Sequence, residues 1–346
     1  MDDDDPNGAA EEGGGRRRRA RGPMVTSEAF EQLATEWAAL HASIPGATPF
    51  THPAWHATWL RHFGSASLPV FLSIRLDDEL VGVAALDMGR DEATTLGDHH
   101  VQDYAGPLVK PDAEAAAAVG LLEWLAEDLT PALDLWGLPA GSPIVEAFAG
   151  AAAGMGWSFS SEAEANCPRL ALPGDFETYI ASLTKHDRHE VRRKLRNLAA
   201  AGAVSFESAT SPEDVDAAMD RFLELMRISR GDKDAFLTPV MEAFFRDLAA
   251  TFARLGMLRL STLALDGVAV AMLLVFENSG ATFLYNSGFD PAFSHLAVGL
   301  LSKVLAIRDA IERGQAEFDF LRGDEAYKRD LGGLPLPLVT VHLRQV

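Results

Sequence analysis

The chain has 346 residues, of which 48% are hydrophobic, and its 30 lysines and arginines stand against 50 aspartates and glutamates. This length suffices for two domains of ordinary size, and the hydrophobic content indicates a globular protein. The net charge of −20 argues against DNA binding, and against nucleic-acid binding in general, because a phosphate backbone is bound mainly by clustered cations.

Cysteine content and hydropathy exclude further classes of protein. The single cysteine, Cys167, excludes a disulfide framework and a multi-thiolate zinc site, and it fits a reducing cytoplasm. We expect its thiol to be buried. No apolar run reaches the roughly 18 residues that a membrane span needs. We therefore expect a cytoplasmic protein without a membrane span.

The first 23 residues carry no hydrophobic periodicity. They combine the acidic run Asp2–Asp5 with the glycines 13–15 and the arginines 16–19. We interpret residues 1–23 as a disordered tail, or as upstream sequence from a mis-set start with Met24 as the true beginning. The arginine run lacks the apolar stretch that a secretory signal needs.

Residues 24–173 are predicted to form a first domain of helices and strands. Apolar positions recur at helical spacing from Ser27 to Ser43, and Pro53 opens a second helix. Asp77-Asp78-Glu79 lies between two apolar runs, which is typical of a β-hairpin. The other elements expected here are a strand near 93–96, a helix at 112–127, a strand at 133–136, a helix at 144–155, and strands at 157–160 and 169–172.

Residues 174–346 repeat this order, with Pro173-Gly174 as the boundary. Asp266-Gly267 joins two apolar runs and is the strongest hairpin signal in the chain. The pattern predicts an α/β protein in which a mixed, mostly antiparallel sheet flanked by helices occurs twice. The other elements expected here are a basic helix at 175–200, a strand at 204–207, helices at 212–229 and 238–252, a strand at 281–287, a helix at 296–313, a strand at 317–321, a helical turn at 324–330 and a strand at 337–343.

The junction between the strand at 281–287 and the helix at 296–313 is a candidate phosphate site. A helix N-terminus leaves backbone N–H groups without partners and carries partial positive charge, which suits a phosphate. Most strand-to-helix turns bind nothing, but small residues stand where this helix starts. Our hypothesis is that the turn holds the pyrophosphate of an acyl carrier, coenzyme A. The residues expected to bind it are His295, Leu296, Ala297, Val298, Gly299 and Leu300.

Four further stretches carry similarity to a known family: residues 49–55, 183–195, 285–290 and 318–328. Together they resemble the GNAT (Gcn5-related) acyltransferases, and most closely the CelD-like acetyltransferases, a branch associated with polysaccharide synthesis. Fem-type peptidoglycan transferases share the tandem GNAT-like architecture of that branch. The resemblance implies two tandem GNAT-like domains, with acetyl-CoA or another acyl-CoA as donor.

The resemblance also implies that only the second copy binds the donor. Where relatives often show Ser-Pro-Gly at the start of the donor helix, this chain has Ala297-Val298-Gly299. The corresponding position of the first half has Lys110-Pro111-Asp112 instead of a Gly-rich turn. The carboxylate of Asp112 would repel a phosphate there.

The stretch after the strand at 317–321 carries candidate catalytic residues. Acyl transfer from a thioester requires that the nucleophile lose a proton, that the oxyanion be stabilised and that the thiolate leave. Asp324 or Glu325 can take the proton, and Tyr327 can protonate the thiolate. Lys328 can stabilise negative charge or hold an anionic group of either ligand. In a purely structural role, Asp324 and Glu325 suit a helix start and Tyr327 packs.

Substrate-binding candidates come from three places. Tyr285 and Asn286 end the strand before the phosphate turn, where the acceptor should lie, although core packing also explains Tyr285. Asp319 either faces the cleft or pairs with a cation. Arg188 and Arg192 lie four apart on the basic helix, and they form either a solvated face or a grip for an anionic acceptor or the donor's phosphate.

The stretch Asp98-His99-His100-Val-Gln-Asp103-Tyr104 has the composition of a metal site. Adjacent histidines point apart on an extended chain, so we expect no metal here. We interpret the stretch as a polar loop that lines the cleft between the domains, with Asp103 and Tyr104 as acceptor contacts.

The predicted reaction is transfer of an acetyl group from acetyl-CoA to an amine or a sugar hydroxyl of a small-molecule or saccharide acceptor. The second copy is expected to be catalytic and the first to shape the acceptor cleft. Two alternatives stay open. One is a Fem-type transferase with aminoacyl-tRNA as donor, against which the acidic balance weighs. The other is a non-catalytic ligand-binding module on the same fold.

Overall fold

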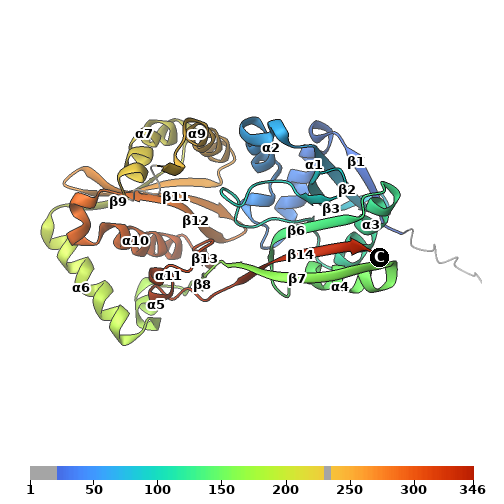
Figure 1. Cartoon of the computed structure of the whole chain (residues 1–346). Helices are drawn as coiled ribbons and strands as arrows, with labels where there is room; N and C mark the ends of the chain where they lie inside the picture. Colours follow the sequence, from blue (N-terminus) through green and yellow to red (C-terminus); the bar gives the residue numbers. More distant parts are fainter. Residues whose placement is uncertain (1–21, 230–234) are drawn as a thin grey trace, which may run out of the picture.

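The computed structural model describes residues 22–229 and 235–346, so residues 1–21 of the expected tail lie outside the described part. Two mixed β-sheets follow one another along an elongated molecule, each with helices packed against it (Figure 1). The predicted class, an α/β protein with two mixed sheets flanked by helices, is confirmed.

The first sheet has the strand order β1-β2-β3-β4-β6-β14-β7, with β5 paired to β3. Only β4 and β6 are paired in parallel among its described strands. The expected hairpin between β2 and β3 is confirmed: Asp77 and Asp78 have φ values of 48° and 71°, as a type I′ turn requires. The strands are β1 (Met24–Glu28), β2 (Pro69–Leu76), β3 (Glu79–Met88), β4 (Ala93–Thr95), β5 (Leu108–Val109), β6 (Ala132–Pro139), β7 (Trp157–Asn166) and β14 (Pro337–Gln345).

The second sheet has the order β8-β13-β12-β11-β10-β9. The predicted hairpin at Asp266-Gly267 is confirmed, since both residues have positive φ and join β10 to β11. The strands are β8 (Arg169–Ala171), β9 (Val204–Ala209), β10 (Leu258–Leu265), β11 (Val268–Asn278), β12 (Ala281–Phe289) and β13 (Glu317–Asp319).

Helices cover both faces of both sheets. The helices of the first half are α1 (Phe30–Ser43), α2 (Pro53–Phe63), α3 (Glu114–Glu127) and α4 (Pro143–Met155), with short 3-10 helices η1 (Pro49–Thr51) and η2 (Gly64–Ala66). Those of the second half are α5 (Phe176–Ser182), α6 (Lys185–Ala201), α7 (Pro212–Ser229), α9 (Pro239–Arg254), α10 (Val298–Glu312) and α11 (Ala326–Asp330), with the 3-10 helix η3 (Pro291–Leu296).

One hydrophobic core runs through both halves, from α1 and α2 to α7 and α9. Trp55 of α2 is fully buried and lies edge-on to the rings of Phe244 and Phe252 of α9 and Phe276 of β11, with centroids 5.8–6.2 Å apart. Aromatic pairs of this kind each contribute about 0.5–1.5 kcal/mol beyond the area that they bury. The two halves are therefore held together by packing as well as by the chain.

Two of the differences from the expected elements concern helices. The helix expected from Ser27 begins at Phe30, because residues 24–28 instead pair as strand β1 with the edge of β2. The helix expected at 175–200 is two helices, since Leu183 is extended and the side chain of Thr184 caps α6 by accepting the N–H of Asp187.

Two strands belong to a different sheet from the one that the sequence analysis expects. Strand β14, which the sequence analysis places in the second half, lies between β6 and β7 in the first sheet (Figure 1). Strand β8, expected to close the first half, pairs with β13 in the second sheet. The two crossing segments run side by side, with a bridge between Arg169 and Leu334. The C-terminal strand β14 is therefore part of the sheet of the first half.

The geometry that matters for function lies where β12 and β13 separate. They pair in parallel only over Ala281–Phe283 and Glu317–Asp319. Beyond that point β12 carries a bulge at Tyr285, because Leu284 faces Val275 and Asn286 faces Leu274. A bulge bends its strand and redirects side chains. Helix α10 leads from the C-terminal end of β12 back to the start of β13, and its first turn lines a cavity together with residues of β12 and residues that follow β13.

Candidate functional site

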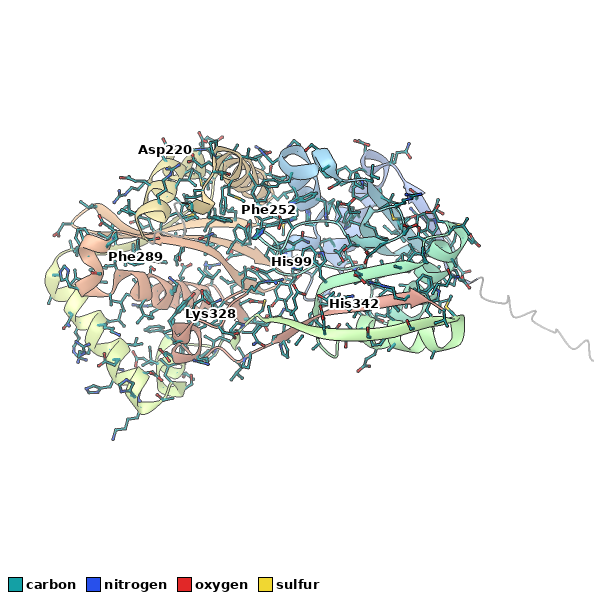
Figure 2. All side chains as sticks on the ribbon, viewed as in Figure 1. His99, Asp220, Phe252, Phe289, Lys328 and His342 are labelled. Atoms are coloured by element: carbon teal, nitrogen blue, oxygen red, sulfur yellow. The ribbon has the colours of Figure 1, made fainter. Side chains whose placement is uncertain are left out.

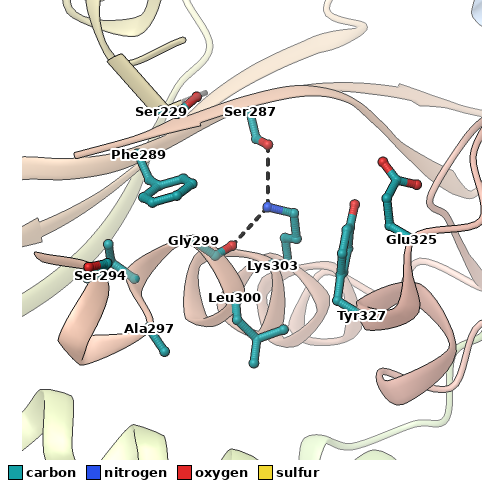
Figure 3. A pocket seen from close by; sticks show the side chains of 11 residues that line it. Ser229, Ser287, Phe289, Ser294, Ala297, Gly299, Leu300, Lys303, Glu325 and Tyr327 are labelled. Carbon is teal, nitrogen blue, oxygen red and sulfur yellow. Dashed lines mark hydrogen bonds between the residues drawn. The ribbon is translucent and has the colours of Figure 1, made fainter. Parts of the chain in front are cut away.

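The N-terminus of α10 opens on a cavity of ≈ 370 Å³, which we call the donor cavity (Figure 3). Four of the six residues expected to bind phosphate line it: Ala297, Val298, Gly299 and Leu300. His295 and Leu296 belong to the preceding helix η3 and are not among its lining residues. Its other lining residues are Ser229, Ser287, Phe289, Ser294, Lys303, Glu325 and Tyr327.

The first residues of α10 line the donor cavity and include a glycine, so a ligand can come close to the backbone there. Ala297 has a left-handed conformation, with φ 56°, and its carbonyl accepts the N–H groups of Leu300 and Leu301. Within the described residues no side chain caps this N-terminus. A Cβ at Gly299 would lie 3.0 Å from the ring of Phe289, which is a tight contact. The absence of a β-carbon leaves room for the ring and keeps the helix start accessible.

Lys303 adds a cation to the same wall, and the sequence analysis missed it. Its side chain is almost buried, with 8% of the residue exposed, and its Nζ donates to the carbonyl oxygen of Gly299 at 2.8 Å and to Oγ of Ser287 at 3.3 Å. The ammonium also lies 5.2 Å from the ring centroid of Tyr327. A lysine within the apolar face of this helix was the signal that could have revealed it.

A second cavity of ≈ 210 Å³, the acceptor cavity, adjoins the first. Ser287, Glu325 and Tyr327 line both cavities. The loop between β4 and β5 contributes His100, Val101 and Asp103 from the first half of the chain. The second half contributes Phe236, Phe245, Leu284, Tyr285, Asn286, Phe320, Leu321, Arg322 and Lys328.

The candidate catalytic residues occupy different positions. Tyr327 and Glu325 point into the donor cavity beside Lys303 (Figure 3). Asp324 is exposed, lines neither cavity and accepts a hydrogen bond from Nδ2 of Asn166 at 3.1 Å. Glu325 occupies the N-cap position of α11 without capping it through its side chain.

Lys328 is buried and holds the turn that forms the cavity wall. Its Nζ donates to the carbonyl oxygens of Leu321 and Arg322 at 2.9 and 2.7 Å, and it pairs with Glu325 at 3.0 Å. Leu321 has φ 58°, a conformation that costs energy for a branched residue. The ammonium of Lys328, which lies inside the second half (Figure 2), therefore stabilises a strained turn.

Asp319 pairs with a cation, which answers one question that the sequence left open. It is fully buried, and its carboxylate accepts the hydroxyl of Tyr104 at 2.7 Å and contacts Nε of Arg169 at 2.9 Å. The N–H of Leu321 also donates to it, at 2.7 Å. Burial raises the pKa of Asp319 to about 6, against the opposing effect of Arg169. Neither Asp319 nor Tyr104 lines the donor cavity or the acceptor cavity; their contacts support the turn at Leu321, which lines the acceptor cavity.

Asp103 lines the acceptor cavity beside Arg322. The carboxylate Oδ1 of Asp103 lies 3.5 Å from Nε of Arg322, and the side chain is 17% exposed. Burial raises the pKa of Asp103 to about 6, while the charges of Arg322 and Lys328 lower it. Arg322 also reaches Oε1 of Glu164 at 2.8 Å, and Nδ1 of His99 lies 2.9 Å from the same oxygen where the two halves meet (Figure 2).

Tyr285 both packs and lines the acceptor cavity. Its ring lies 5.6 Å from that of Trp55, and its hydroxyl donates to the carbonyl oxygen of Val101 at 2.9 Å. Burial raises its pKa well above the usual range. Its neighbour Asn286 accepts the N–H of Ser287 through its own side chain at 2.8 Å.

Arg188 and Arg192 line neither cavity. Arg188 donates to the carbonyl oxygen of Ala181 at 2.9 Å, and Arg192 pairs with Glu177 at 2.7 Å. Both contacts lie on the outer surface of α5 and α6.

Cys167 is buried, as expected, and burial raises the pKa of its thiol. Over the described residues, no group of three or more histidine, cysteine, aspartate or glutamate side chains is placed to hold a metal ion. In the same part of the chain, none of the helices combines the length and apolar character that crossing a membrane requires.

Residues 185–329 match the family described as Acetyltransferase (GNAT) domain, and this range contains the whole donor cavity. No curated protein matches the chain. The fold of the whole chain is therefore compared with solved structures.

The chain is similar to FemX, with a TM-score of 0.65, 13% identity and coverage of 91% of this chain and 96% of that one. It is similar to a conserved protein of unknown function from Bacteroides thetaiotaomicron, with a TM-score of 0.63, 11% identity and coverage of 93% and 100%. It is also similar to the C-terminal domain of a protein assigned as a lysylphosphatidylglycerol synthetase from Agrobacterium fabrum, with a TM-score of 0.60, 12% identity and coverage of 91% and 92%. At these identities the similarity shows the fold alone, and the GNAT match itself covers residues 185–329; two mixed sheets flanked by helices agree with two GNAT-like domains in tandem.

Proposed function

We propose that the protein is an acyltransferase that moves an acyl group, in the first place acetyl, from coenzyme A to an amine or a sugar hydroxyl. The observation that carries the proposal is the uncapped N-terminus of α10 at the wall of a cavity that adjoins a second, more polar one. Residues 174–346 bind the donor, and residues 24–173 shape the acceptor side.

The diphosphate of the donor binds the backbone N–H groups of Val298 and Gly299 at the start of α10, since the N–H of Leu300 already donates to the carbonyl of Ala297. Partial positive charge at a helix N-terminus favours an anion by about 0.3–1 kcal/mol at an exposed site and more in a partly buried one. The Lys303 ammonium on the same wall adds to this field. The thioester then extends past Ser287 toward the acceptor cavity, because Ser287 lines both cavities.

The transfer step uses two of the three side chains that line both cavities, those of Glu325 and Tyr327. The nucleophilic nitrogen or oxygen of the acceptor forms a bond to the acyl carbon, and the carbon–sulfur bond breaks. Glu325 takes the proton that the acceptor loses, and Tyr327 gives a proton to the departing thiolate. General acid–base steps of this kind contribute roughly 10²–10⁴-fold to a rate. Asp324 and Lys328 have supporting roles, the latter by holding the turn at Leu321.

The similarity to CelD-like acetyltransferases favours a saccharide or other small acceptor, and the Fem-type likeness keeps aminoacyl-tRNA as the second donor to be tested. We test the donor by titration calorimetry with CoA and desulfo-CoA, and by release of free thiol from acetyl-CoA in the presence of acceptors. We expect saturable binding of both nucleotides with one site per chain. Absence of CoA binding would overturn the proposal, and transfer from aminoacyl-tRNA in its place would establish the second donor.

Turnover then separates an enzyme from a binding module. CoA binding with acyl transfer to at least one amine or sugar is expected. CoA binding without transfer to any acceptor of a broad amine and sugar panel would leave a non-catalytic module as the better account.

A further inference from the structure

The turn that connects β13 to α11, residues 320–325, determines where two side chains of the transfer step lie. Glu325 and Tyr327 line both cavities, and Tyr327 belongs to α11, a helix of 5 residues. A helix this short is not stable by itself, so its place depends on the contacts around it. The turn packs tightly, since a β-carbon at Gly323 would overlap Oε2 of Glu325. The positions of Glu325 and Tyr327 therefore depend on the conformation of this turn.

Two sets of hydrogen bonds hold the backbone of the turn. Leu321 has φ 58°, a left-handed conformation that a branched residue adopts only at a cost in free energy. Nζ of Lys328 in α11 donates to the carbonyl oxygens of Leu321 and Arg322 at 2.9 and 2.7 Å. The N–H of Leu321 donates to Oδ1 of Asp319 at 2.7 Å. Asp319 and Lys328 together therefore keep a conformation that Leu321 does not favour by itself.

The two oxygens of the Asp319 carboxylate have separate partners. Oδ1 accepts the N–H of Leu321, whereas Oδ2 accepts the hydroxyl of Tyr104 at 2.7 Å and lies 2.9 Å from Nε of Arg169. Asp319 is fully buried, so water does not replace a lost partner. An asparagine side chain offers one oxygen and an NH₂ group that donates, so it cannot satisfy both sets of donors. Only a carboxylate serves the turn and the contact with the first half at once.

We propose that Asp319 is a positioning residue of the acyl transfer: its carboxylate fixes the turn at Leu321 and thereby places Glu325 and Tyr327 where the two cavities adjoin. Asp319 lines neither cavity, so it acts through the turn and not on a ligand. Misplacement of a reacting group by about 1 Å can lower a rate by roughly 100-fold. The inference rests on the proposed function, because Glu325 and Tyr327 are the acid–base groups of that reaction.

The ionisation of Asp319 gives this role a signature in the pH dependence of the rate. Burial raises the pKa of Asp319 to about 6, against the opposing charge of Arg169. The titratable and charged side chains that face it are Tyr104 of the β4–β5 loop, Cys167 before β8, Arg169 of β8 and Glu317 of β13. Burial raises the pKa of the Tyr104 hydroxyl and of the Cys167 thiol, so both stay protonated between about pH 5 and pH 8. Protonation of Asp319 below about pH 6 removes an acceptor from its partners and releases the turn.

The first test compares wild type with Asp319→Asn by thiol release from acetyl-CoA, with saturating amounts of the amine or sugar that wild type acetylates fastest. At about pH 8 we expect kcat to fall at least tenfold, while the KM for acetyl-CoA and the calorimetric Kd for CoA stay within about threefold of wild type. The difference in kcat should shrink below about pH 6, because the protonated Asp319 of wild type then resembles the variant. Burial also raises the pKa of Asp103 to about 6, but Asp103 titrates in both proteins and cancels from their ratio.

Glu317→Gln is the matched control for the first test. It removes a second carboxylate of β13 that contacts Arg169, at 3.3 Å from Nη1. In the described part of the chain, the ion pair of Glu317 is with Arg169 and not with the turn. We therefore expect Glu317→Gln to keep the kcat of wild type at every pH of the series.

A second variant, Tyr104→Phe, covers the case in which Asp319→Asn does not fold, because it leaves the carboxylate beside Arg169. The hydroxyl of Tyr104 lowers the pKa of Asp319 by donating to the ionised form. Its removal should raise that pKa, so the fall of kcat at low pH should begin about half a pH unit higher than in wild type. A contact that serves stability alone would leave the pH profile of kcat in place.

Thermal unfolding establishes which variants are folded. A folded Asp319→Asn variant with the kcat of wild type at pH 8 overturns the inference, and so does an unshifted pH profile of kcat in Tyr104→Phe. If wild type fails to bind CoA or to transfer an acyl group, the proposed function fails and this inference with it. Turnover by wild type together with unaffected variants overturns the inference alone.

Discussion

The hydroxyl of Tyr104 donates a hydrogen bond of 2.7 Å to the buried carboxylate of Asp319, and this contact joins the two halves of the molecule behind the acceptor cavity. Nε of Arg169 lies 2.9 Å from the same carboxylate and donates a hydrogen bond to the hydroxyl of Tyr104, and the N–H of Leu321 donates to Asp319. The carboxylate therefore connects the first half, the crossing segment and the turn that forms the cavity wall.

Tyr104→Phe removes this hydrogen bond, and the longer one that Nε of Arg169 donates to the same hydroxyl at 3.2 Å, without opening a cavity. We expect the free energy of unfolding to fall by about 1.5–3 kcal/mol, because hydrogen bonds to charged groups lie in that range. Tyr179→Phe is the matched control: Tyr179 is also buried, but its hydroxyl donates to the neutral carbonyl of Leu331. Its loss should cost about 1 kcal/mol. Urea unfolding of both variants measures the difference, and equal costs would contradict a charged acceptor at Asp319.

Gly299→Ala places a β-carbon against the ring of Phe289 at the start of α10. We expect the Kd for CoA to rise at least tenfold, because the displaced ring or the methyl group narrows the entrance to the helix N-terminus. Gly150→Ala in α4 is the control, since nothing lies within 4 Å of the added carbon. It should leave the Kd unchanged and stabilise the protein by about 0.5–1 kcal/mol. Calorimetry measures both affinities. A Kd for CoA equal to that of wild type in Gly299→Ala would argue against binding of CoA at the N-terminus of α10.

Tyr327→Phe removes the proposed proton donor to the thiolate. We expect kcat to fall by at least tenfold with little change in KM for acetyl-CoA, because the hydroxyl acts in the transition state. Steady-state assays with a good amine acceptor measure both constants. Tyr179→Phe again serves as control, and a kcat equal to that of wild type in Tyr327→Phe would remove the residue from the mechanism.

Much of the fold follows from local sequence patterns. The two hairpins could be predicted because Asp77-Asp78 and Asp266-Gly267 are residues that adopt the left-handed turn conformation. The order of elements in each half was also predictable, since apolar periodicity is local. The exchange of β8 and β14 between the sheets was not, because strand pairing depends on contacts between distant segments.

The site was predictable only in part, for the same reason. The start of α10 has a local signature, and Ala297–Leu300 line the donor cavity. Lys303 was missed because a single lysine in a helix carries no motif. Tyr104 was expected at the acceptor and Asp319 either there or in an ion pair; both are buried in a network that joins residues 215 positions apart. No local pattern indicates such a partner.

The buried histidines His52 and His56 have lowered pKa values, which predicts a loss of stability at acidic pH. His56 is buried beside Trp37, with ring centroids 5.1 Å apart, and burial together with the neighbouring His52 lowers its pKa from 6.5 to about 3. The folded state disfavours the charged form of the His56 ring. The stability that the neutral ring contributes is therefore fully present above pH 6.5. It is lost at about 1.4 kcal/mol per pH unit as the pH falls from 6.5 toward 3.

The raised pKa values of Asp103 and Asp319 act in the opposite direction between about pH 4 and 6. The test is therefore a comparison of wild type with His56→Leu, which isolates one histidine. Between pH 6.5 and 5, the wild-type free energy of unfolding should fall by about 2 kcal/mol more than that of the variant. Parallel pH profiles from urea titrations would show that His56 does not resist protonation in the folded protein.

The most direct test of the central claim is a crystal structure of the protein with bound desulfo-CoA. We predict that the diphosphate accepts hydrogen bonds from the backbone N–H groups of Val298 and Gly299, with the pantetheine arm passing Ser287 toward Tyr327. A nucleotide bound elsewhere, with the start of α10 left unoccupied, would contradict the account.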